Sequence, residues 1–319
     1  MSNSKIYDFF LADGYKITIN VLIFFELLLF LIIIWKTVSR KKSGFNLLFL
    51  LMMNSIISGI LSAIGYLLNW KVKVDDSDRK KLLFGESDGF LCQTQSFMIA
   101  YFQSTRETFC SLITIIVFMS YKIKNFDIQN MRPLYKFYIL LLGNGIPLIA
   151  NIIYSIVGLF GDSHLFCFTK LYVDKTVSIC GTIHFVYIII LISLSFFFIL
   201  YIIIKDCKNR KNVWTNLDDN NKKKCFSDPQ LKKIIFYPFA QILANSFIFY
   251  HRFTDFFFEN KVEHENNMRS GPAAVVNTVS SLLYIIIFIL SNDIFCSDEE
   301  NEDKTLNEKN TDISLINLI

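Results

Sequence analysis

The residues best suited to chemistry lie together in the middle of an apolar stretch that runs from Cys92 to Met119. Residues 103–108 read Gln-Ser-Thr-Arg-Glu-Thr, and hydrophobic runs precede and follow them. An arginine at membrane depth costs at least about 2–3 kcal/mol unless it faces a bundle interior, a partner or water. We therefore expect an inner helix here, in which Arg106 and Glu107 serve as a charge pair, as ligand contacts or as a switch.

A wider polar stripe follows from helical spacing. Gln103, Glu107 and Cys110 lie three or four positions apart and share one broad face with Arg106. A second buried charge, Glu26, falls in the middle of another apolar run, and a lone carboxylate there is usually protonated, hydrogen-bonded or paired with a base. Two arrangements stay open: Glu26 pairs with Arg106, or Glu107 and backbone groups satisfy Arg106 locally.

Two further side chains are candidates for ligand binding or switching. His184 lies near the outer end of the apolar run at 179–204, where it either packs as a hydrogen-bonded residue or contacts a ligand. Arg252 lies at the outer rim of the run at 234–253, where it would attract an anionic ligand. The four histidines do not share a metal-ligand spacing on one helix, so we expect no metal site and no membrane-embedded hydrolase.

The elements that must position these residues are membrane spans. Hydrophobic residues make up 53% of the 319 residues, a share typical of membrane proteins. Runs near the length needed to cross a bilayer recur at 17–36, 45–68, 97–119, 134–160, 179–204, 234–253 and 271–291. We expect an all-α membrane protein, a bundle of seven transmembrane helices. The short loops leave no room for a catalytic domain, so we expect no enzyme and no cofactor.

Basic residues flank the spans and predict orientation. Lysine and arginine concentrate after the first, third and fifth spans, which places those loops in the cytosol and the N-terminus outside. The expected organisation is an extracellular segment at 1–16, a seven-transmembrane receptor domain at 17–291 and an acidic, disordered cytosolic tail at 292–319. No cleavable signal peptide is expected. This distribution points to membrane lipids as partners, in a multi-pass protein of the cell membrane, and not to nucleic acid.

Cysteine positions narrow the choice of disulfide. In this topology Cys92 and Cys167 lie on the extracellular side, at the start of the third span and in the loop after the fourth. They either form a disulfide at the extracellular end of the third helix or remain two free thiols. The other five cysteines lie in spans, at their edges or on the cytosolic side: Cys110, Cys180, Cys207, Cys225 and Cys296.

The C-terminal tail carries candidate modification sites. Cys296 follows the last span directly and is a candidate for palmitoylation. Hydroxyl residues in the acidic tail are candidates for phosphorylation, namely Ser297, Thr305, Thr311 and Ser314.

Several short motifs carry a resemblance to a known family. Cys92-Gln93-Thr94-Gln95 opens the third span, Ile146-Pro147 interrupts the fourth, and the sixth contains Tyr237-Pro238 and Tyr250-His251-Arg252-Phe253. In these motifs the chain resembles the cyclic-AMP-receptor-like family of social amoebae, over about residues 15–295. The resemblance implies a G-protein-coupled receptor for an extracellular small-molecule ligand, cyclic AMP or a related signal, acting through a heterotrimeric G protein. The rhodopsin-type signatures of the third and seventh helices are absent.

A second function fits the same intramembrane charges. Glu26, Arg106 and Glu107 are candidates to line an ion or proton path in a multi-pass transporter or channel. The sequence contains no recognisable internal repeat, and seven spans with an external N-terminus favour a receptor.

Overall fold

The computed structural model describes residues 3–39, 47–68, 90–123, 131–162, 167–169, 175–214, 240–242, 245 and 266–291. This part of the chain is almost entirely helical. Its long elements are α1 (Asn3–Ser39), α2 (Leu47–Leu67), α4 (Phe90–Lys122), α5 (Pro133–Ile156), α6 (Lys175–Trp214) and α9 (Asn266–Ser291), together with the short strands β1 (Phe160–Asp162) and β2 (Cys167–Thr169).

Four helices are long and apolar enough to cross a membrane. Their apolar segments are Lys16–Thr37, Leu47–Leu67, Pro133–Ile156 and Thr182–Lys205. These segments match four of the expected spans closely. In α9 a shorter apolar helix covers Ala274–Leu290. Length and composition therefore identify a membrane protein, in which α4 stands apart because its polar stripe makes it less apolar than its neighbours.

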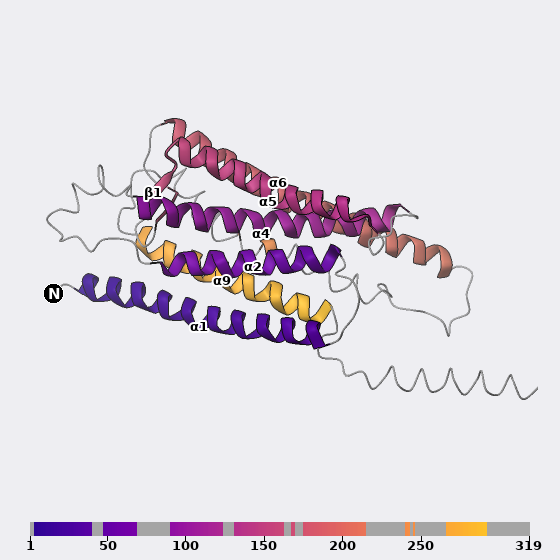
Figure 1. Ribbon diagram of the computed structural model, residues 1–319, viewed down its shortest axis with the longest axis horizontal. Helices are drawn as coiled ribbons and strands as arrows, with labels where there is room; N and C mark the ends of the chain where they lie inside the picture. The colour runs from indigo at the N-terminus through magenta and orange to yellow at the C-terminus, as the bar shows by residue number, and fades with distance from the viewer. Residues whose placement is uncertain are drawn as a thin grey trace, which may run out of the picture.

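Helix α4 is the inner helix that the sequence predicts. It packs against α2, α5, α6 and both strands, while α1 and α2 both pack on α9. Figure 1 shows α4 running between the α5 and α6 pair on one side and the α2 and α9 pair on the other. Most of its residues between Gln95 and Val117 are buried. A helix with neighbours on every side has no lipid-facing surface, so it can carry polar side chains at membrane depth.

The outer surface has the opposite character. Large apolar side chains on α1 and α5 are exposed, including Phe24 at 64%, Trp35 at 74% and Ile156 at 78%. By contrast, Arg106 and Glu107 are fully buried. Apolar side chains outside and charged side chains inside are the reverse of a water-soluble protein, and they fit a bundle whose solvent is lipid.

Helix α5 ends earlier than the sequence suggests. We expected the span to continue to residue 160, but the helix stops at Ile156. Gly158 takes a positive φ of 73° and donates its N–H to Ser155 O, while Leu159 N–H donates to Tyr154 O. This is the Schellman arrangement, in which a left-handed glycine closes the helix. The turn frees Phe160 to begin β1.

Two other helices are longer than expected. Helix α1 begins at Asn3, so most of the segment expected at 1–16 is helical and continuous with the first span. Helix α6 continues to Trp214, ten residues past the expected end at 204. Neither extension contains a proline, so nothing in the backbone chemistry stops the helix where the apolar residues end.

The expected all-α fold needs one correction in the loop after α5. Strands β1 and β2 form a small antiparallel hairpin in which Gly161 pairs with Phe168. A disulfide joins Cys167 of this hairpin to Cys92 of α4, with their Cα atoms 5.2 Å apart, which confirms the predicted bridge. Gln95 adds two hydrogen bonds beside the disulfide. Its Oε1 accepts the Cys167 N–H at 3.2 Å, and its Nε2 donates to Gly65 O at 2.9 Å. The hairpin is thereby fixed to α4 and to the end of α2.

Candidate functional site

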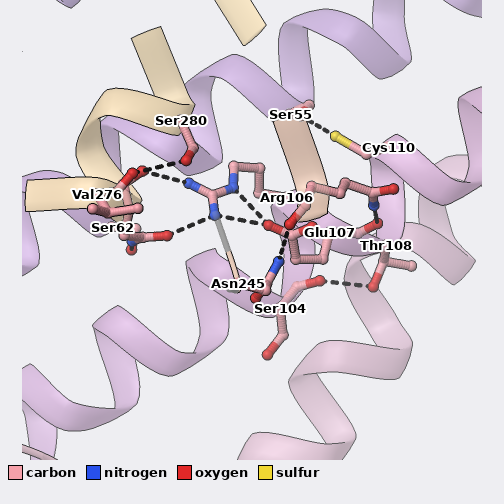
Figure 2. A network of polar contacts seen from close by, with 12 residues as sticks. Ser55, Ser62, Ser104, Arg106, Glu107, Thr108, Cys110, Asn245, Val276 and Ser280 are labelled. Carbon is pink, nitrogen blue, oxygen red and sulfur yellow. Dashed lines mark hydrogen bonds and ion pairs between the residues drawn. The ribbon is translucent and has the colours of Figure 1, made fainter. Parts of the chain in front are cut away.

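The centre of the bundle holds a buried network around Arg106. Its Nε and Nη2 donate to Glu107 Oε1 at 3.1 and 2.7 Å. From α9, Asn277 accepts two more bonds, at 2.6 Å through its side-chain Oδ1 and at 3.1 Å through its backbone O. Figure 2 shows the guanidinium group of Arg106 held between Glu107 and α9. All three guanidinium nitrogens are engaged, so Arg106 joins α4 to α9 through charge-assisted bonds.

The structure decides between the two arrangements that the sequence left open. Arg106 is satisfied by Glu107 within α4 and by Asn277 of α9, and not by an ion pair with Glu26, so the local alternative is correct only in part. Asn277 was not predicted as a partner of Arg106, although an asparagine inside an apolar helix is a signal for such a contact. The ring of Tyr284 adds a cation–π contact, with its centroid 5.5 Å from Arg106 Cζ.

Glu26 reaches the edge of this network from α1. It is fully buried, with Ser281 of α9 beside it and Arg106 close enough to act on it electrostatically. Ser281 interacts with the Glu26 carboxyl, but neither Glu26 oxygen nor Ser281 Oγ makes a hydrogen bond of full geometry. A side chain on Gly59 would collide with Ser281 Oγ, so the glycine allows α2 and α9 to approach here.

A second set of contacts ties α4 to α6 and to the described residues at 240–245. Gln241 Nε2 donates to Glu107 O at 3.0 Å and to Ser111 Oγ at 3.3 Å. Ser195 of α6 donates to the same Ser111 Oγ at 3.1 Å. Asn245 Nδ2 donates to Gln241 O at 2.8 Å. The polar face of α4 therefore binds two other segments at the level of Glu107.

Toward α2 the contacts are weaker. Ser55 Oγ lies 3.2 Å from Cys110 Sγ, and Asn277 Nδ2 lies 3.5 Å from Ser62 Oγ. Cys110 is buried and is a free thiol. Its predicted place on the polar face of α4 is correct, and its role there is packing and weak hydrogen bonding.

Several buried oxygen atoms in this core lack a partner. They are Glu107 Oε2, Gln241 Oε1, Asn245 Oδ1, Gln103 Oε1 and Thr105 Oγ1. A buried polar atom without a hydrogen bond costs roughly 1–3 kcal/mol. Such atoms are rare in folded proteins, and each can mark local strain, an ordered water or a bound ion.

His184 lies in a different environment from Arg106. Its ring packs edge to face on Tyr154, with centroids 5.2 Å apart. Tyr154 belongs to the apolar cluster that also contains Phe160 and Phe168 of the hairpin. The histidine therefore packs on an aromatic residue of this cluster and takes no part in the hydrogen bonds described above for Arg106.

The remaining predicted sites cannot be placed in this description. Six of them fall outside the described residues: Arg252, Cys296, Ser297, Thr305, Thr311 and Ser314. Among the residues that the structure describes, no group of three or more histidine, cysteine, aspartate or glutamate side chains is arranged to hold a metal ion.

Comparison of the sequence with models of known protein families found no family that matches. A search of curated proteins likewise found no matching relative. Functional inference therefore depends on the residues and their geometry.

Proposed function

We propose that this chain is a cell-membrane receptor of the seven-helix, G-protein-coupled type, similar to the cyclic-AMP-receptor-like family. Its ligand would be an extracellular small molecule, cyclic AMP or a related signal, and its cytosolic partner a heterotrimeric G protein. The observation that carries the proposal is that one helix, α4, holds both the disulfide-bound hairpin, through Cys92 and Gln95, and the Arg106 network. A ligand that moved the hairpin would act on the same helix that holds the buried charges.

The contacts in the core suggest how such a signal would cross the bundle. Arg106 binds Asn277 of α9, and Gln241 binds the Glu107 carbonyl, so α4 is the common partner of both connections. Moving either partner away from α4 would break bonds that are individually specific and fully buried. A ligand drives such a change only if it binds one arrangement more tightly than the other. In this proposal Arg106 and Glu107 form the switch, while His184 and Arg252 belong to the ligand side.

Ligand-stimulated dissociation of a G protein in living cells tests the proposal. Cells expressing the chain would be screened with conditioned medium and with cyclic nucleotides, using energy transfer between labelled G-protein subunits as the readout. A response in the wild type that is lost in Cys92→Ala at equal surface expression supports the receptor and the role of the hairpin. Silence toward every stimulus at confirmed surface expression contradicts it.

A transporter or channel is the second candidate, and one specific observation favours it. Glu26 and Glu107 carry buried carboxyl oxygens without partners, as groups that exchange protons or ions often do. Flux of protons or monovalent cations into vesicles reconstituted with the chain would separate the two functions. Flux that is lost in Glu26→Gln would favour transport, and impermeable vesicles would favour the receptor.

A further inference from the structure

The buried core of the described residues holds more acidic than basic side chains. Its buried Asp, Glu, Lys and Arg side chains are Glu26, Arg106 and Glu107. Two carboxyl groups and one guanidinium leave one negative charge in excess when both acids are ionised. Because an uncompensated charge is costly away from water, the core requires either a proton or a bound cation to balance it.

Most of the unpartnered atoms of the core can only accept hydrogen bonds. Gln241 Nε2 donates to a backbone carbonyl, and Asn245 Nδ2 does the same, so the amide oxygen of each is the free atom. Glu107 uses only Oε1 for Arg106, which leaves Oε2 without a partner. Gln103, one turn away on α4, has an unpartnered Oε1 as well. Acceptor oxygens of this kind suit a cation or a hydrogen-bond donor, and they repel an anion.

Arg106 does not offer an alternative site for an anion. Its Nε, Nη1 and Nη2 already donate to Glu107 and Asn277. A phosphate or carboxylate could bind the guanidinium only by displacing partners that are 2.6 to 3.1 Å away. The positive charge of Arg106 opposes a nearby cation unless both carboxyl groups are ionised.

We propose that Glu107 Oε2, Gln241 Oε1 and Asn245 Oδ1 form a binding site for a small monovalent cation. The ion would bind between α4 and the described residues at 240–245, where Gln241 Nε2 donates to the Glu107 carbonyl and Asn245 Nδ2 donates to the Gln241 carbonyl. Figure 2 shows Glu107 and Asn245 within one polar network. The site uses one charged and two neutral oxygens, a set that suits a monovalent ion or the ammonium group of a small amine better than a divalent metal. The cation would hold the segment at 240–245 against α4.

Thermal unfolding of the purified full chain in detergent tests the site. Sodium, potassium, methylammonium and N-methylglucamine chlorides would be compared at constant ionic strength and pH, with the unfolding midpoint as the readout. A site of this kind predicts a saturable rise of roughly 3–6 °C with one of the small cations and none with bulky N-methylglucamine. A rise with sodium or potassium assigns a metal ion, whereas a rise with methylammonium alone assigns an organic ammonium group.

Two variants test whether the cation that raises the unfolding midpoint binds at the proposed site. Glu107→Gln keeps the size of the side chain but replaces a carboxylate oxygen with an amide nitrogen, so the rise should disappear. Asn245→Asp adds a negative charge to the proposed site, so the cation should bind about 3- to 10-fold more tightly. Asn151→Asp is the matched control, because Asn151 is also buried with an unpartnered Oδ1 and its Nδ2 likewise donates to a backbone carbonyl.

Three results would overturn the proposal. Midpoints that are equal in all four salts would mean that a proton or water completes the core. A cation response that survives in Glu107→Gln would place the ion elsewhere. If the cation bound as much more tightly to Asn151→Asp as to Asn245→Asp, the cause would be a general effect of charge and not a specific site.

Discussion

At the scale of single residues, Arg106 illustrates how a membrane helix holds a charge. The guanidinium loses its water on burial and receives four hydrogen bonds and an aromatic face in return. Charge-assisted bonds are roughly twice as strong as neutral ones, so the arrangement depends strongly on each partner. Asn277 supplies two of the four bonds from another helix, so it does more than Glu107 to fix the relative position of α4 and α9.

Replacing Asn277 should therefore destabilise the bundle. Asn277→Ala removes the side-chain acceptor 2.6 Å from Arg106 and is expected to cost about 1.5–3 kcal/mol, the range for a bond to a charged group. The unfolding midpoint in detergent measures this. Asn144→Ala is the control, because that side chain is partly buried and donates within its own helix to Leu140 O. Equal midpoints for the two variants would contradict the role assigned to Asn277.

Some of this residue-level chemistry was predictable. A charged pair inside an apolar run requires an inner helix, whatever the fold, so Arg106 and Glu107 could be placed from composition and spacing. Asn277 and Gln241 were not assigned to Arg106 and Glu107, because 171 and 134 positions separate them in the sequence. One sequence carries no information about which helices become neighbours.

At the scale of elements, small residues determine how closely the helices pack. A Cβ atom on Gly143 of α5 would lie 2.4 Å from Phe109 Cε1 of α4. Gly59 of α2 similarly allows Ser281 of α9 to approach. Without a hydrophobic force between helices in lipid, such close contacts supply much of the packing energy.

Two glycines of α5 provide a direct test of this packing. Gly143→Ala should overpack the contact with Phe109 and destabilise the bundle by roughly 1–3 kcal/mol. Gly145→Ala has no atom within 4 Å of the new Cβ, so it should stabilise the helix by about 0.5–1 kcal/mol. The two substitutions have opposite expected signs within one helix. Equal shifts in the unfolding midpoint would show that α5 does not pack on α4 through Gly143.

The disulfide makes the hairpin part of the bundle. Its loop spans 75 residues, so removing the bridge should lower stability by roughly 2–4 kcal/mol. Cys92→Ser, Cys167→Ser and the double variant should shift the midpoint equally, because each removes the same bond. Additive shifts would mean that the two cysteines act independently and are not bridged to each other.

At the scale of the whole molecule, the outward apolar surface and the inward charges describe a membrane bundle. Four apolar helices and the inner helix α4 follow from hydrophobic run length and from the cost of an exposed charge. Helix ends were harder to predict, since α1 and α6 continue beyond their apolar segments and the glycine turn after α5 starts a hairpin. Apolar run length marks the lipid core, whereas helix length depends on backbone chemistry beyond it.

Orientation remains a prediction from the basic loops, and glycosylation can measure it. Lys5→Ser creates an acceptor at Asn3, and Asp312→Thr creates one at Asn310. With the N-terminus outside and the tail in the cytosol, only the Asn3 acceptor should gain a sugar that glycosidase removes. Glycosylation at Asn310 alone would reverse the topology and place the hairpin on the cytosolic side.

We propose that the buried Arg106 network acts as the switch of a membrane receptor. The most direct measurement is G-protein dissociation in cells that express wild type, Arg106→Lys and Arg106→Ala at matched surface levels, with a stimulus that activates the wild type. We expect a lost response in Arg106→Ala and a reduced one in Arg106→Lys, which keeps the charge but not the two-sided bonding to Glu107 and Asn277. A fully responsive Arg106→Ala protein would contradict the proposal.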